Sequence, residues 1–292
     1  MTVPIGEFTA TRIEQFSAPG GSWSQIFPAL TQAVLDGHKP WMIPDYYDPI
    51  AQTFITSIHS WLLRTPASTI LIDACAGNGK ERSLARYHHL NSPFLERLAH
   101  AGCRPEDVDV VVCTHMHVDH VGWNTRLENG RWIPTFPNAR YLFTRTEYDY
   151  WTSEHGRQST AASDVARIHA DSIAPVIEAG LATFVDDAHD VAPGVRLEAA
   201  HGHTPGHSIV RSSSGGNTGI FSGDVMHQPF QIYEPEVSSR YCVDPDRATT
   251  TRLRLLAECA DFNYLLLPAH FGAPHVGRIR RNGPGFTFHP GL

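Results

Sequence analysis

Four residues of metal-binding type fall within six positions of the chain, in the segment His115-Met116-His117-Val118-Asp119-His120. The segment follows the apolar run Val108 to Cys113, which is typical of a strand buried in a sheet on both faces. Imidazole and carboxylate groups suit zinc and related divalent ions, and burying four of them without a ligand is costly. The pattern therefore predicts a metal site at the end of a buried strand, in preference to a chance histidine cluster on a solvated loop.

Three further candidate ligands stand later in the chain, each where a predicted strand begins or ends. His207 begins a strand after a Pro-Gly turn, and Asp224 and His270 follow apolar strands. Residues at such positions can meet along one edge of a sheet, which gives a site a rigid support. By residue type alone, His201 and His203 remain alternatives to His207.

Strand and helix patterns alternate along the whole chain. Short apolar or alternating runs predict strands at 7–16, 54–63, 69–73, 108–113, 140–143, 195–200, 207–211, 220–222 and 264–267. Capping signals predict helices at 93–101, 163–179 and 245–260, with Ser92 and Asp244 as caps of the first and third. This distribution favours two packed sheets covered by helices over one doubly wound parallel sheet, although the pattern alone leaves both open.

The composition is typical of a globular protein, and it gives no indication of a polyanionic partner. Its 292 residues are 41% hydrophobic and 18% charged, so we expect one domain over 1–292. A net charge of -7 without a Lys or Arg run argues against nucleic acid and for a small-molecule substrate. Residues 1–53 are expected to form an N-terminal extension. Its aromatic stretch 19–53 is expected to be packed on the domain or to form a homodimer contact, and a flap over the site is the alternative.

The sequence carries neither a membrane signal nor a disulfide framework. The first residues lack the basic start and apolar stretch of a signal peptide, and no segment reaches the ~20 apolar residues of a membrane span. We therefore expect a cytoplasmic protein without a membrane partner. The five cysteines are widely spread and lack a C-x-x-C spacing, so neither disulfides nor a thiolate metal site is indicated.

Taken together, these motifs resemble the metallo-β-lactamase-fold hydrolase superfamily. The His-x-His-x-Asp-His, Gly-His-Thr-Pro-Gly-His, Ser-Gly-Asp and Pro-Ala-His segments occur in the order typical of that family, over about Phe54 to Val276. The resemblance implies an α+β fold, an αβ/βα sandwich of two mixed sheets flanked by helices, with the metals at the sheet edge. It implies two divalent metal ions, with zinc expected, held by His115, His117 and His207, by Asp119, His120 and His270, and by Asp224 as a bridge.

The same resemblance implies roles for residues around the metals. Asp73 matches a carboxylate that supports the ligands from behind, although an Asx turn at a strand end would also explain it. Asp119 would orient the nucleophile or take its proton. The nearest branches are N-acyl-homoserine-lactone lactonases and methyl-parathion-hydrolase-like enzymes. His227 is expected to act in catalysis, since it stands where many lactonases have Tyr.

The activity expected from the resemblance is hydrolysis by a hydroxide that bridges the metals. It would open a lactone or cleave a carboxylic or phosphate ester of a small apolar substrate. The pocket wall is expected from aromatic residues that flank the ligands in sequence, namely Trp123, Phe136, Trp151, Phe230 and Phe271.

The sequence is also compatible with two alternative functions. A glyoxalase II-like thioester hydrolase or persulfide dioxygenase shares the first motif, but no glutathione-binding extension is evident after His270. A non-enzymatic binding protein would be expected to have lost ligands, and here every ligand position is filled.

Overall fold

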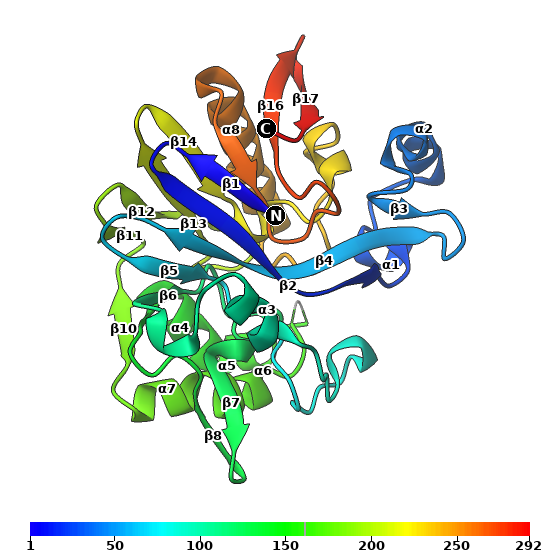
Figure 1. The fold of residues 1–292 in the computed structure, drawn as a ribbon. Helices are drawn as coiled ribbons and strands as arrows, with labels where there is room; N and C mark the ends of the chain where they lie inside the picture. Colours follow the sequence, from blue (N-terminus) through cyan, green and yellow to red (C-terminus); the bar gives the residue numbers. More distant parts are fainter. Residues whose placement is uncertain (161) are drawn as a thin grey trace.

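Two packed β-sheets with helices on both outer faces form the body of the protein (Figure 1). The computed structural model describes residues 1–160 and 162–292. The first sheet contains β1 (Thr2–Ile5), β2 (Phe8–Pro19), β3 (Tyr47–Asp48), β4 (Thr53–Arg64), β5 (Thr69–Ile72), β6 (Val110–Val112), β9 (Arg140–Thr144) and β10 (Ala182–Val185). The second contains β11 (Ala188–Ala192), β12 (Val195–Ala199), β13 (Ser208–Ser214), β14 (Asn217–Phe221), β15 (Leu265–Leu267), β16 (Gly277–Asn282) and β17 (Gly285–Pro290).

The helices and a small hairpin complete the fold. The α-helices are α1 (Trp23–Ile26), α2 (Gln32–Met42), α3 (Phe94–His100), α4 (Arg145–Thr152), α5 (Glu154–Arg157), α6 (Val165–Ile168), α7 (Ala174–Glu178) and α8 (Pro245–Phe262). The strands β7 (Thr125–Glu128) and β8 (Arg131–Pro134) pair only with each other. Among the described residues, no helix is long and apolar enough to cross a membrane.

Both sheets are mixed. In the first, β5, β6, β9 and β10 run parallel, and the remaining neighbours pair antiparallel. In the second, only β14 and β15 are parallel. This topology confirms the expected α+β sandwich and excludes a single doubly wound parallel sheet.

The alternation of side chains along the central strands explains the layers. In β6, Val110 and Val112 belong to the apolar cluster between the two sheets, which also contains Leu197 and Leu267 of the second sheet. Val111 points to the opposite face and joins the cluster under the outer helices. Because successive side chains of a strand alternate between its faces, a continuous apolar run is what a strand covered on both sides requires.

The helix boundaries differ from the predictions where local bonds compete. Asp244 caps α8 as predicted, and its carboxylate accepts from the Arg247 N–H at 3.0 Å. Ser92 does not cap α3, because its hydroxyl donates to the side-chain oxygen of Asn78 at 2.9 Å. The helix predicted over 163–179 is divided by a π-helical turn before Pro175, which lacks the N–H that a continuous helix needs.

The aromatic stretch 19–53 is packed on the body of the protein. Phe27, Leu30 and Leu35 are buried in the same apolar cluster as Ile220 and Leu266 of the second sheet. The helices α1 and α2 lie beside the far end of β4 (Figure 1). The stretch is therefore part of the folded core on this side, and its role in a homodimer stays a prediction.

Candidate metal centre

The candidate ligands meet because four strands end at the same edge. The parallel pair β5 and β6 leads into Asp73 and the His115 to His120 loop, and the parallel pair β14 and β15 leads into Asp224 and His270. Backbone bonds hold the strand ends in register. The Asp73 N–H donates to the Val112 carbonyl at 2.8 Å, and the Ser222 N–H donates to the Leu267 carbonyl at 3.2 Å.

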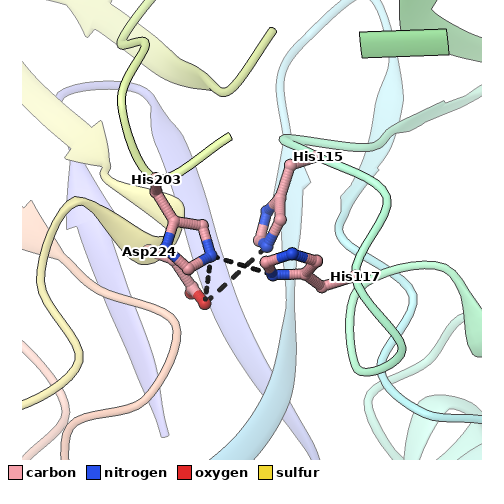
Figure 2. A group of neighbouring side chains, drawn as sticks. All are labelled: His115, His117, His203 and Asp224. Carbon is pink, nitrogen blue, oxygen red and sulfur yellow. Dashed lines mark hydrogen bonds and ion pairs between the residues drawn. The ribbon is translucent and has the colours of Figure 1, made fainter. Parts of the chain in front are cut away.

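The first group of side chains contains His115, His117, His203 and Asp224, whose ligand atoms all lie within 4.8 Å of one another (Figure 2). The Asp224 Oδ2 atom is 3.4 Å from His203 Nε2 and 3.7 Å from His115 Nε2. The His203 Nε2 atom is 2.9 Å from His117 Nδ1. All four side chains are buried and point toward one centre.

The second group contains Asp119, His120 and His270. Asp224 lies beside it too, because its Oδ1 atom is 3.3 Å from His120 Nε2 and 3.0 Å from His270 Nε2. Both of these nitrogens have an Asp119 oxygen at 3.8 Å. Asp224 thus presents one carboxylate oxygen to each group.

The spacing of these atoms fits metal coordination. In a tetrahedral zinc site with bonds of about 2.0–2.1 Å, neighbouring ligand atoms are about 3.3 Å apart. The observed separations of 2.9 to 3.8 Å surround this value. The buried Nε2 atoms of His115 and His120 have no hydrogen-bond partner in the described part of the chain, and a metal ion would coordinate their lone pairs.

The imidazoles of His115, His203 and His270 each have a partner at Nδ1. His115 Nδ1 lies 3.1 Å from the Thr114 hydroxyl oxygen, and His270 Nδ1 lies 3.0 Å from the Ser57 carbonyl oxygen. His203 Nδ1 lies 3.6 Å from the Cys242 sulfur. Such partners fix the tautomer and leave the Nε2 lone pair free to bind a metal.

Asp73 lies behind the second group. Its Oδ2 atom is 2.9 Å from His120 Nδ1, and its Oδ1 atom accepts from the Thr114 N–H at 2.8 Å. The backbone of Asp73 has a φ of 57°, in the left-handed region that Asp tolerates better than most residues. The carboxylate therefore connects the end of β5 to two positions of the ligand loop.

The pKa values of the histidines differ with their neighbours. Burial lowers the pKa of His115 and His203 well below the usual range and lowers the pKa of His117 to about 4. These three imidazoles are therefore neutral at pH 7, which is the form that binds a metal. Burial would also lower the pKa of His120, but the Asp224 and Asp73 carboxylates outweigh it and raise that pKa. A cation beside these carboxylates is thus favoured, whether a proton or a metal ion.

The structure does not bring His207, which was expected as the third histidine, into the first group of side chains. Its Nδ1 lies 3.1 Å from the Ala200 carbonyl oxygen, and its Nε2 accepts from the Asp224 N–H at 3.0 Å. Both ring nitrogens are therefore engaged by backbone groups, and His203 stands beside His115, His117 and Asp224 in its place. His207 instead holds the Asp224 backbone, at a point where a Cβ atom on Gly223 would lie 2.7 Å from His207 Nε2.

Glu147, which the sequence analysis missed, joins the two ligand loops. Its Oε1 atom accepts from the Met116 N–H at 2.9 Å and from the Trp151 indole at 2.6 Å. Its Oε2 atom accepts from the Thr204 hydroxyl at 2.7 Å and from the Gly206 N–H at 3.0 Å. The buried carboxylate therefore fixes the loop that carries His115 and His117 against the loop that carries His203.

A cavity of about 220 Å³ opens beside the two groups and includes Asp119, Asp224, His227 and His270 in its wall. The His227 Nε2 atom is 3.3 Å from Asp224 Oδ2, so this side chain lies beside the two groups, and its role in catalysis stays a prediction. Tyr87 also lines the cavity, and its hydroxyl donates to Asp119 Oδ2 at 2.7 Å.

The aromatic wall of this cavity differs from the prediction. It contains Phe27, Phe54, Tyr87 and Tyr241, and none of the five aromatic residues predicted from sequence. All five lie elsewhere. Trp123 stacks on Phe94, and Trp151 lines a separate cavity of about 20 Å³. The other three are fully buried in the core, namely Phe136, Phe230 and Phe271. Proximity to a ligand in sequence did not predict proximity to the cavity.

Comparison with known proteins identifies the family. The sequence profile described as the Metallo-beta-lactamase superfamily matches residues 55–270. With this match over most of its length, and with this fold and His/Asp cluster, the chain belongs to the metallo-β-lactamase superfamily of metallo-hydrolases.

Curated relatives are distant and cover only part of the chain. A transcription termination factor FttA of Methanosarcina mazei is 25% identical over 189 residues, which are 61% of this chain and 27% of that protein. An N-acyl homoserine lactonase of Bacillus thuringiensis is 27% identical over 151 residues, which are 48% of this chain and 51% of the lactonase. The chain thus spans about a quarter to a half of the length of these relatives.

Solved structures match over nearly the whole chain. The hydrolase AbOPH of the beta lactamase superfamily has a TM-score of 0.83 at 24% identity and covers 100% of this chain and 97% of its own. AidC, a dizinc quorum-quenching lactonase, has a TM-score of 0.82 at 20% identity, again with 100% and 97% covered. At this identity the likeness concerns the fold.

Proposed function

We propose that this protein is a dinuclear metal-dependent hydrolase that opens a lactone or cleaves a carboxylic or phosphate ester of a small molecule. The observation that carries the proposal is the pair of His/Asp groups that share Asp224 at the wall of a cavity. The similarity in fold to the dizinc lactonase AidC and in sequence to an N-acyl homoserine lactonase supports the hypothesis that the substrate is a lactone.

The ligand set that we propose follows the geometry. His115, His117 and His203 would hold one ion, Asp119, His120 and His270 would hold the other, and Asp224 would contribute one oxygen to each. Zinc is the expected metal, because borderline imidazole and hard carboxylate ligands suit it. When bound, a pair of such ions polarises the substrate carbonyl or phosphoryl oxygen and makes water nucleophilic at neutral pH.

Asp119 and Tyr87 are the proposed groups for proton handling. Asp119 lines the cavity, and Tyr87 donates to its Oδ2 atom, so the carboxylate is held in one orientation beside the second group. From this position it can accept the proton of an attacking water molecule. Burial raises the pKa of Tyr87 well above its usual range, so its hydroxyl stays protonated and remains a donor.

His227 is the proposed contact to the substrate's oxygen. It lines the cavity next to Asp224, and its Nδ1 atom is buried without a hydrogen-bond partner among the described residues. Burial lowers the pKa of His227, so the ring is neutral and one nitrogen carries a proton to donate. A neutral donor at the wall can stabilise charge that develops on the substrate oxygen.

Metal analysis combined with a substrate panel tests the proposal. The purified protein should contain two divalent ions per chain and should hydrolyse at least one of a lactone series, an aryl ester and a phosphotriester. Asp119→Ala should abolish most of this turnover. A protein with well under one ion per chain, or an Asp119→Ala variant with unchanged turnover of all substrates, would refute it. Preference for a thioester, or oxygen consumption with one iron per chain, would instead favour the glyoxalase II-like alternative.

A further inference from the structure

One arginine beside the cavity has no partner for its charge among the residues that the structure describes. Arg86 lies in the short 3-10 helix Ala85–Tyr87 and lines the cavity next to Tyr87, the residue that contacts Asp119. Its guanidinium carbon is 5.6 Å from the centre of the Phe16 ring and 5.3 Å from that of the Tyr87 ring. Two aromatic rings therefore hold the head group in place.

The guanidinium makes no hydrogen bond or ion pair in residues 1–160 and 162–292. Its Nε and Nη2 atoms are buried, and both lack a partner there. Arg82, four positions earlier, shows the ordinary arrangement, because its Nη1 and Nη2 atoms donate to the two Asp171 oxygens at 2.6 and 2.8 Å. Arg86 as a whole is half-buried, but buried N–H groups without an acceptor destabilise a fold, and a ligand in the cavity can supply the missing acceptor.

The same side of the cavity carries a second positive charge. Arg240 and Tyr241 line the cavity with Arg86, and Arg240 is exposed. Burial and the negative charge of Asp119 raise the pKa of Tyr241, and the charges of Arg240 and Arg86 oppose this rise. Ile26, Phe27 and Phe54 provide an apolar part of the wall. The cavity of this net acidic chain is thus apolar in one part and cationic in another.

We infer that Arg86 binds a carboxylate group of the substrate that is separate from the bond to be hydrolysed. The enzyme would therefore prefer anionic esters or lactones over neutral ones. The inference rests on the proposed hydrolase function. A planar guanidinium presents paired N–H donors that match the two oxygens of a carboxylate, and an apolar wall suits the acyl or aryl body between the two ends. Arg86 would be a specificity-determining residue, with Arg240 attracting the anion at the rim.

A matched pair of aryl esters tests the inference. The two esters carry, at the para position of the aryl ring, either a carboxylate or a carboxamide, which has the same shape without the charge. The wild-type ratio of kcat/KM for the anionic over the neutral ester should fall at least about tenfold in Arg86→Met, as expected for loss of one charged hydrogen-bonded contact. Arg145→Met is the control, because Arg145 is an exposed arginine 5.3 Å from the Phe184 ring and outside the cavity wall.

The outcomes separate this inference from the proposed function. An unchanged ratio in Arg86→Met, or an equal loss for both esters, overturns the role of Arg86 while hydrolysis itself stands. If neither ester is hydrolysed, calorimetric binding of benzene-1,4-dicarboxylate and its monoamide decides. A preference for the dicarboxylate that disappears in Arg86→Met supports the subsite, and equal affinities in both proteins overturn it. If Arg86→Met does not fold, Arg86→Lys replaces it, and an unreduced ratio or binding preference there overturns the paired-donor contact.

Discussion

Replacing Glu147 by Gln should loosen the first metal group without touching a metal ligand. The carboxylate accepts four hydrogen bonds, two from backbone N–H groups of Met116 and Gly206 and two from side chains. An amide has only one accepting oxygen, and its NH2 group would face donors. Either orientation of Gln leaves at least one buried backbone N–H without an acceptor.

The size of the effect follows from these bonds. An unsatisfied buried N–H costs about 1–3 kcal/mol, and the surviving bonds weaken because the acceptor loses its charge, so we expect a loss of about 2–4 kcal/mol in unfolding free energy. With an unfolding entropy of roughly 2.1 cal/mol/K per residue over 292 residues, this loss lowers Tm by about 3–7 °C. Since Glu147 positions both loops of the first group, bound metal should fall from two ions toward one.

Thermal unfolding and metal analysis of the variant measure both effects. Glu178→Gln is a matched control, because Glu178 is an exposed glutamate at the end of α7 and should change Tm by less than about 1 °C. Metal-free samples of both variants separate the loss of hydrogen bonds from the loss of metal. If the Glu147→Gln variant has the Tm of the wild-type protein and retains two ions, the carboxylate does not position the loops.

Three further substitutions or conditions probe the site. His203→Ala should leave one ion per chain. His207→Ala should keep two ions and lose about 1–3 kcal/mol of stability, since both ring nitrogens of His207 are hydrogen-bonded to backbone groups. Equal metal loss in the two variants would argue against this assignment. Tyr87→Phe should lower kcat/KM about tenfold with unchanged metal content, because Asp119 loses a donor, and steady-state kinetics with metal analysis check this. Burial lowers the pKa of His275 from 6.5 to about 4, so the unfolded chain binds more protons than the folded chain between these two pH values. The unfolding free energy of the metal-free protein, measured with a denaturant, should therefore fall as the pH drops from 6.5 to 4. An unfolding free energy that does not change over this range would contradict the prediction.

The strands and most ligand positions could be predicted because their signals are local. Apolar runs such as Val108 to Cys113 require burial on both faces wherever they occur, and the structure places them in the sheet centres. Asp224 and His270 stand directly after such runs, so the parallel pairing of β14 and β15 brings them together. Little beyond the strand pattern and the family resemblance was needed for these residues.

The choice between His203 and His207 depended on contacts that the sequence does not display. Both histidines flank the same turn, and either spacing is compatible with a ligand. What decides is the long-range placement of the Ala200 carbonyl and the Asp224 N–H at the ring nitrogens of His207. The prediction of the aromatic residues in the cavity wall was wrong for the same reason, since Phe27 and Tyr87 come from segments far from any ligand in sequence.

Glu147 is a residue for which a local sequence motif predicts the wrong contact. Thr144 and Glu147 have the spacing of a capping box at the start of α4, and the Thr144 hydroxyl oxygen does accept from the Glu147 N–H at 3.4 Å. A capping box would turn the Glu147 carboxylate back to the Thr144 N–H. Here the carboxylate instead accepts from the two ligand loops, because the Gly206 backbone packs against the start of α4 and brings competing donors within reach. A Cβ atom on Gly206 would lie 2.2 Å from the Glu147 nitrogen. The same residue pair that looks like a local helix signal is therefore a tertiary link in the metal centre, and only the packing of loops distant in sequence distinguishes the two.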